Sequence, residues 1–246
     1  MSATVALARS EFRLFVREPA ALFWSVVFPV VLLVILGSVP PFRETDPDTG
    51  VRMINYYTPV ILLMSLSFLA VATMPAVIAG YREQLILKRL ATTPIGSARM
   101  LGAQLALYLG LALAMAVLVV LVARLAFDVP VPRQLFGFAL TFLLTIAALL
   151  AIGMLVAAIV PTGRTASAVG AMLFFPLMFF AGLWIPIPAM PAVLAEVARF
   201  SPLGAATEAM TTTTAGEWPA WWVLPLLAVY GVVFGGLAVR FFRWEQ

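Results

Sequence analysis

The chain contains no cysteine and no histidine. The lack of cysteine excludes disulfides, thiolate nucleophiles and cysteine-ligated metal sites. The lack of histidine further excludes Ser-His-Asp and Cys-His catalysis, HExxH zinc sites and haem held by His or Cys. We therefore expect no catalytic residue, no bound cofactor and no metal site in this chain.

Phosphate-binding and ion-coupling groups are also missing. There is no GxxxxGK[ST] loop, and Lys88 is the only lysine, so we do not expect the chain to hydrolyse ATP itself. No carboxylate, lysine or histidine lies near the middle of a long apolar stretch, where transport driven by an ion gradient commonly needs one. Energy for active transport would have to come from another protein, or the process is passive.

Charged residues are scarce, at 11% of the chain, whereas 63% of the residues are hydrophobic. Soluble domains have about 25% charged and 45–50% apolar residues. A bilayer core about 30 Å thick needs about 20 apolar residues of helix. The sequence predicts one all-α membrane domain over residues 1–246 with six transmembrane helices. The expected spans are Ala20 to Val39, Tyr57 to Gly80, Leu101 to Ala126, Phe136 to Val160, Ala166 to Ile185 and Trp221 to Val239.

The basic residues are divided unequally between the two sides of these spans. Ten lie on the side that holds both termini and five on the other. The positive-inside rule then predicts a multi-pass protein of the bacterial cytoplasmic (inner) membrane with both termini in the cytoplasm. Because the basic residues flank spans and form no continuous patch, we expect no nucleic-acid partner. We also expect no cleavable signal peptide, since the first apolar run is long enough to span.

The segment before the first span has the pattern of a helix lying in the cytoplasmic interface. Three arginines share one side and apolar residues gather on the other, although Glu11 and Glu18 fall at the edge of the apolar side. A plain charged tail is the alternative. The arginines are Arg9, Arg13 and Arg17, and the apolar residues are Val5, Ala8, Phe12, Phe15 and Val16.

The segment between the second and third spans predicts a short amphipathic cytoplasmic helix. Apolar residues follow i, i+3, i+4, i+7 spacing, and charged residues cover the remaining surface. Thr93 before Pro94 marks the end of this helix. It is available to a protein partner, or it caps the bundle.

The segment 186–219 is a long external connection interrupted by Pro188, Pro191 and Pro202, with apolar residues from Val193 to Phe200. Loops of this length are usually functional or disordered, and this one is too apolar for disorder. We expect short helices that dip into the outer leaflet and pack against protein.

Three stretches, in this order, resemble the permease (transmembrane) subunits of type 2 ATP-binding-cassette (ABC) exporters, a family that exports drugs, lipids and polysaccharides. The likeness covers nearly the whole chain. Where many members carry Thr-Tyr and later an arginine, this chain has Gly204, Ala205 and Thr211, which weakens any substrate role tied to that arginine. The stretches are Arg17-Glu18-Pro19 running into Phe28-Pro29; residues 82–94, REQLILKRLATTP; and Phe175-Pro176 through Ala181-Gly182 and Met190-Pro191 to Ser201-Pro202-Leu203.

The resemblance implies an interfacial connecting helix at 1–19, a coupling helix in the loop 81–98 that docks on a separate ABC ATPase subunit, and a re-entrant helical hairpin at 186–219. It also implies two permeases, either two copies or a copy with a paralogue, and two ATPase subunits that use ATP and Mg. The substrate path would lie between the permeases. We assign ATPase coupling to Arg82, Glu83, Leu87, Lys88, Arg89 and Leu90.

The expected cargo is hydrophobic or amphipathic, such as a drug-like molecule or a lipid, because the spans lack ionisable side chains. A polysaccharide or glycolipid fits less well. A cluster of phenylalanines near Pro176 either lines the substrate path or packs and faces lipid. A passive channel or scramblase, an importer and a membrane enzyme remain alternatives, and the sequence leaves the cargo and the choice between homodimer and heterodimer open. The phenylalanines are Phe174, Phe175, Phe179 and Phe180.

Overall fold

The computed structural model describes residues 3–45, 50–86, 89 and 97–242. Within this part of the chain, six helical stretches are long and apolar enough to cross a membrane. The prediction of an all-α membrane protein with six spans is confirmed. These stretches are α2–η1–α3 (Pro19–Leu22, Phe23–Val27, Phe28–Ser38), α5–η2–α6 (Met53–Ser67, Phe68–Thr73, Met74–Glu83), α8 (Ser97–Phe127), α9 (Leu135–Ile159), α10 (Gly163–Ala181) and α13 (Val223–Phe241).

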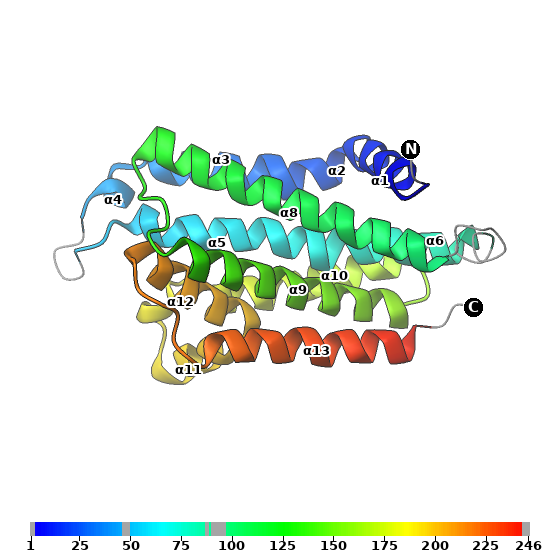
Figure 1. The fold of residues 1–246 in the computed structure, drawn as a ribbon. Coiled ribbons are helices and arrows are strands. Elements are labelled where there is room, and N and C mark those ends of the chain that lie inside the picture. Colours follow the sequence, from blue (N-terminus) through cyan, green and yellow to red (C-terminus); the bar gives the residue numbers. More distant parts are fainter. Residues whose placement is uncertain (1–2, 46–49, 87–88, 90–96, 243–246) are drawn as a thin grey trace.

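The helices form one elongated bundle with α5–η2–α6 at its centre (Figure 1). This second span is the most buried of the six, and its middle is mainly apolar, with the buried serines Ser65 and Ser67 among the apolar side chains. Around it, α9 packs against α13, α12 and α6, while α10 packs against α6 and η2. The core of the protein is therefore the second span with its neighbours α9 and α10.

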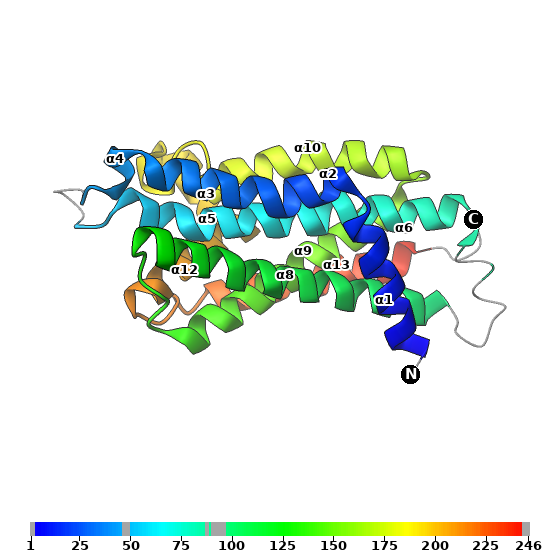
Figure 2. The ribbon, with the colours of Figure 1, turned by 90° about the horizontal axis from the view of Figure 1, so that it is seen from above.

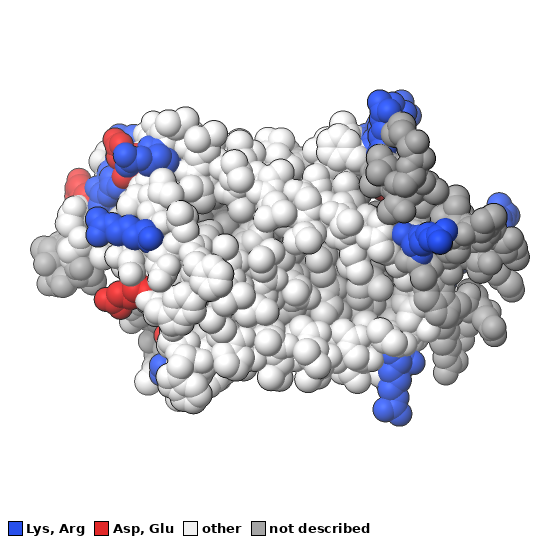
Figure 3. All heavy atoms as spheres, viewed as in Figure 1, with Lys and Arg blue, Asp and Glu red and all other residues white. Residues whose placement is uncertain are grey.

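The two ends of the bundle differ in what they hold. Helix α1 (Ala3–Val16), the end of α6 and the end of α13 lie at one end, here called the α1 end; α4 (Pro40–Arg43), α11 (Ala192–Phe200) and α12 (Pro202–Ala215) lie at the other, the α12 end (Figure 1). In the face shown in Figure 3, charged side chains gather at both ends and the band between them carries none. This is the distribution expected of a protein that crosses a bilayer.

Helix α1 crosses the bundle steeply instead of continuing the first span (Figure 2), and it packs against α8. The chain turns at Arg17 and Glu18, and Pro19 then begins α2, as proline favours the first position of a helix. The sequence analysis expected a helix within residues 1–19, and the structure has one there. Its place in the membrane interface stays a prediction.

Some helix boundaries differ from those that the apolar pattern predicts, and two of them have a local cause. Helix α10 ends at Ala181, four residues before the expected end at Ile185, because Gly182 adopts a left-handed conformation, with φ 87°, and caps the helix. The second span begins at Met53, four residues before Tyr57. Both errors concern polar or glycine-bearing ends, where hydropathy carries little information.

The segment 186–219 contains two successive helices, where the sequence analysis expected short helices; the re-entrant hairpin implied by the family resemblance stays a prediction. A 3-10 turn, η3 (Ile187–Ala189), and α11 lead into α12, whose first turn is capped by the Ser201 hydroxyl accepting from the Gly204 N–H at 3.0 Å. Helix α12 is largely buried against α9, α10 and α13. The Thr207 hydroxyl donates to the Ala181 carbonyl at 2.9 Å, which holds α12 to the end of α10.

Both the first and second spans contain a π-helical turn, and these turns, η1 and η2, face each other. The Ser65 hydroxyl donates to the Ser25 carbonyl, and the rings of Trp24 and Phe68 lie 6.1 Å apart. A π-helical turn shifts backbone hydrogen bonds from i→i+4 to i→i+5 and is frequent at functional positions in helices. No feature of the sequence analysis indicated these turns.

Candidate functional site

Arg82 lies at the end of α6 and caps α9. Its side chain is only 8% exposed. Nη1 donates to the Ala158 carbonyl at 2.9 Å, and Nη2 donates to the Val160 carbonyl. The last carbonyls of a helix lack partners within the helix and carry the negative end of its dipole. The guanidinium therefore supplies hydrogen-bond donors to the carbonyls at the end of α9 and joins this end to α6.

Glu83 makes the complementary contact with the start of α10. Its Oε2 accepts from the Gly163 N–H at 3.1 Å, and Gly163 is the first residue of α10. The first N–H groups of a helix are free, and this end of the dipole attracts negative charge. Arg82 and Glu83 together hold the turn between α9 and α10 from both sides. We call this arrangement the Arg82–Glu83 clamp.

The clamp lies at the base of the loop 81–98 that the sequence analysis assigned to ATPase coupling. Leu87, Lys88 and Leu90 lie outside the described residues. Arg89 is described and exposed, and its backbone N–H donates to the Leu85 carbonyl at 3.0 Å. The structure thus brings two of the six assigned residues together, on the α9–α10 turn. That the six contact an ATPase stays a prediction.

Glu11 of α1 lies beside the clamp and is 5% exposed. Its Oε2 accepts from the Tyr81 hydroxyl at 2.8 Å and from the Gln104 side-chain amide. Burial raises the pKa of Glu11, and the hydrogen bonds from Tyr81 and Gln104 oppose that rise. The sequence analysis treated Glu11 as a break in the amphipathic pattern. A carboxylate on the apolar side of a helix was the signal that α1 has polar partners in the bundle.

Two cavities open at the α1 end, one on each side of α6. The first has a volume of about 350 Å³ and lies between α1, α6 and α8; the second, of about 380 Å³, lies between α2, η2, α6 and α10. Both are open to the surface, and both are bounded by small or apolar side chains of α6 as well as by Glu18. The residues that line both are Glu18, Ala21, Thr73, Ala76 and Val77.

The ABC-2 type transporter family model matches residues 2–214, from α1 to the end of α12. The chain belongs to the ABC-2 type transporter family. It is therefore the membrane component, or permease, of an ABC transporter, and its partner is an ABC ATPase subunit. No curated protein matches the chain.

The four phenylalanines that were candidates for the substrate path lie on α10 in this ABC-2 permease and face different neighbours. The Phe174 ring contacts Phe68 of η2 at 5.9 Å, whereas Phe175 is 60% exposed and stacks on Trp184 at 6.1 Å. Phe179 and Phe180 contact each other at 5.4 Å. None of the four lines the two cavities at the α1 end. Their role in a substrate path stays a prediction.

A third cavity, of about 500 Å³, lies at the α12 end of the permease between α5, η3, α11 and α12. Thr211 lines it. Arg199 of α11 lines it too, and its Nε lies 3.7 Å from the Glu208 carboxylate. The cavity therefore has a guanidinium that is paired with a carboxylate.

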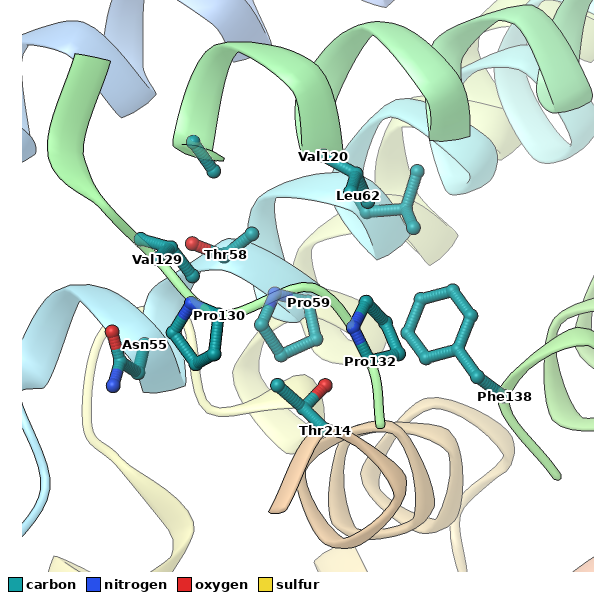
Figure 4. Close-up of a pocket in the computed structure, with 11 residues that line it drawn as sticks. Asn55, Thr58, Pro59, Leu62, Val120, Val129, Pro130, Pro132, Phe138 and Thr214 are labelled. Carbon is teal, nitrogen blue, oxygen red and sulfur yellow. The ribbon is translucent and has the colours of Figure 1, made fainter. Parts of the chain in front are cut away.

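A fourth cavity, shown in Figure 4, lies among Asn55, Pro59, Pro130 and Phe138 near the α12 end. Its volume is about 20 Å³, which is room for about one water molecule. Pro130 and Pro132, from the loop between α8 and α9, line it together with Pro59 of α5. This space is a packing gap and is too small for a transported molecule.

The raised pKa of Glu11 predicts a dependence of stability on pH. Because the folded-state pKa lies above the ordinary value of 4.5, the proton stabilises the fold fully below about pH 4.5, and this stabilisation is lost as pH rises through the folded-state pKa. Tyr81 and Tyr108 also face Glu11, and Arg17 and Glu18 line the same cavity. We expect the Tm in detergent to fall over this window.

Glu11→Gln isolates this effect, since the amide oxygen still accepts from Tyr81 while the titration is removed. The variant should show a flatter dependence of Tm on pH than the wild type, measured by differential scanning fluorimetry. Glu18→Gln, which removes an exposed carboxylate from the same cavity, should keep the wild-type slope. Equal slopes for the wild type and Glu11→Gln would show that the Glu11 pKa does not control this dependence.

Proposed function

We propose that this permease belongs to an ATP-driven exporter that moves a hydrophobic or amphipathic substrate, a drug-like molecule or a lipid, out across the bacterial cytoplasmic membrane. Two permeases, either two copies or one with a paralogue, work with two ATPase subunits that use ATP and Mg. The termini lie in the cytoplasm, so the α1 end faces the ATPases. Membership of the ABC-2 family supports the transporter and the ATPase partner.

The Arg82–Glu83 clamp is the observation that carries the proposed mechanism. The coupling loop 81–98 begins inside α6, and the clamp joins that point to the end of α9 and the start of α10. A force that an ATPase applies to the loop is therefore transmitted to three spans at once. Closure of the ATPases would move α6, α9 and α10 as a unit.

Within the coupling loop, we propose that Lys88 and Arg89 supply polar contacts to the ATPase while Leu87 and Leu90 supply apolar anchors. Apolar side chains at a protein interface exclude water from the contact, and complementary charges add specificity. The burial of the Arg82 guanidinium against α9 supports a different task for this residue. We therefore assign Arg82 to holding the loop in place.

The cargo assignment rests on the apolar character of the spans. The middle of the second span is lined by apolar side chains with only serines and threonines among them. Cavities open at both ends of the permease, and exposed apolar side chains such as Phe175 cover α10. A substrate path between two permeases along α10 would suit an apolar or amphipathic molecule better than a polysaccharide or glycolipid.

Reversing the charges of the coupling loop tests this function. In a complex of permease and ATPase in vesicles, Lys88→Glu with Arg89→Glu should leave ATP hydrolysis in place and abolish ATP-dependent transport of rhodamine 6G or an NBD-labelled phospholipid. A coupling loss of 1–3 kcal/mol corresponds to roughly 5- to 150-fold. Arg240→Glu, an exposed residue at the end of α13, is the control and should transport normally. Unchanged transport in the double variant would rule out the assignment of Lys88 and Arg89.

A further inference from the structure

The cavity between α1, α6 and α8 combines a buried polar wall with apolar surfaces. Its polar wall is formed by Glu11, Tyr81 and Gln104. The apolar lining comes from α1 on one side and from α6 and α8 on the other. The apolar residues that line it include Leu14, Phe15, Val77 and Leu107.

Gln104 in this wall has a hydrogen-bond acceptor that is not used. The side chain is 1% exposed, and its Nε2 donates to Glu11, but its Oε1 has no hydrogen-bond partner among the described residues. A buried acceptor without a donor is unfavourable, so such atoms normally have a partner. The wall therefore has a place for a group that donates hydrogen bonds.

Glu11 offers further acceptor capacity at the same place. The two hydrogen bonds from Tyr81 and Gln104 both end on Oε2, whereas a carboxylate accepts up to about four. Among the described residues, the charged side chains that line the cavity are two carboxylates, Glu11 and Glu18, and one guanidinium, Arg17. The lining thus has an excess of negative charge and of acceptors, which excludes an anion and favours a cation with N–H groups.

We propose that this cavity binds the primary ammonium group of an amphipathic cation, with Glu11 and Gln104 accepting its N–H groups and the apolar lining contacting its hydrocarbon chain. A volume of about 350 Å³ accommodates an ammonium group with part of an alkyl chain. A quaternary ammonium carries the same charge but no N–H group, so it cannot use the two acceptors. The difference in affinity between a primary and a quaternary ammonium therefore distinguishes a specific hydrogen-bonding site from a general apolar groove.

Binding of octylammonium and octyltrimethylammonium, measured calorimetrically on the purified permease in phosphatidylcholine nanodiscs with empty nanodiscs subtracted, tests the site. The two probes share their chain and charge. We expect the wild type to bind octylammonium about tenfold more tightly, the value for one charge-assisted hydrogen bond of about 1.4 kcal/mol. Equal dissociation constants in the wild type would overturn the proposal, whatever the variants do.

Variants then locate the site. Gln104→Met replaces the amide acceptor with an apolar side chain of similar length, and Glu11→Gln removes the carboxylate charge. Each variant should reduce the preference for octylammonium to about twofold or less, because each weakens the charge-assisted hydrogen bonding of the ammonium group. Glu18→Gln removes an exposed carboxylate at the same cavity and should keep most of the preference. A preference that persists in both Gln104→Met and Glu11→Gln would place the binding elsewhere and contradict the proposal.

The natural source of the ammonium group is either a lipid headgroup or a free amphiphile. In nanodiscs that also contain phosphatidylethanolamine, competition with octylammonium would identify the headgroup of this lipid as an occupant, and unchanged binding would identify a free amphiphile. The measurement uses the permease without its ATPase. A negative binding result would therefore leave the proposed exporter function unaffected. Absence of ATP-driven export would likewise leave the proposed binding site unaffected.

Discussion

Gly153→Ala and Gly170→Ala are expected to prevent the permease from folding to normal yield. A Cβ at Gly153 would lie 1.9 Å from the Ala70 carbonyl oxygen, and one at Gly170 would lie 2.4 Å from the Val71 carbonyl oxygen. Both neighbours are backbone atoms of η2, so no side-chain rotation relieves the contact. Overpacking of a core usually costs about 1–3 kcal/mol, and contacts with backbone belong at or above the upper end of this range.

The measurement is the fraction of the purified permease that elutes as a single species in size-exclusion chromatography, together with its Tm. Gly102→Ala and Gly110→Ala are matched controls in α8, because a Cβ at either position meets nothing within 4 Å. Alanine is about 1 kcal/mol more favourable than glycine in a helix, so both controls should keep or raise the Tm. Yields of Gly153→Ala equal to those of Gly102→Ala would contradict the packing described for η2.

These glycines explain how the π-helical turn of the second span fits into the bundle. The turn shifts the hydrogen bonds of η2, and its carbonyls Ala70 and Val71 approach α9 and α10 at Gly153 and Gly170. Only a residue without a side chain permits so close an approach of two backbones, as in other helix contacts within membranes. The centre of the second span is thus held between the same two helices that the Arg82–Glu83 clamp joins at the α1 end.

Arg82→Met is expected to abolish transport while the permease remains folded and its ATPase remains active. The substitution keeps an unbranched, flexible side chain but removes the donors to the Ala158 and Val160 carbonyls, and it thereby disconnects the coupling loop from α9. Transport of rhodamine 6G should fall by about tenfold or more, because a coupling free energy of about 1–3 kcal/mol corresponds to a change of roughly 5- to 150-fold. ATP hydrolysis by the same complex should change much less.

Arg240→Met is the matched control, because Arg240 is exposed at the end of α13. It should leave transport and hydrolysis near the wild-type rates. The Tm of Arg82→Met should fall moderately, since a buried acceptor without a donor costs about 1–3 kcal/mol. A parallel loss of transport and hydrolysis, or normal transport, would contradict the role assigned to the clamp.

The sequence predicted the six spans because their signal is local: each is a run of about 20 apolar residues, and polar segments separate the runs. Short helices between the prolines of the segment 186–219 were also expected, and α11 and α12 lie there, whereas the hairpin was an implication of the family resemblance. The end of α10 was predicted wrongly, although Gly182 is a known type of helix end. Hydropathy alone does not register such a cap.

The candidate site was predictable only in part, because its contacts join residues far apart in the chain. The partners of Arg82 lie 76 and 78 residues away, and the partners of Glu11 lie 70 and 93 residues away. One sequence shows that these residues are charged and where they stand on a helix, but not which backbone or side chain they meet. The same reason hid the approach of Gly153 to η2.

Purification of the tagged permease from its native membrane, followed by an ATPase assay on the purified material, tests the central claim most directly. The account predicts a stoichiometric nucleotide-binding subunit and ATP hydrolysis that vanadate inhibits. Recovery of the permease alone from a gentle detergent, with no hydrolysis and with passive conduction or lipid scrambling after reconstitution, would contradict it and favour a channel or scramblase.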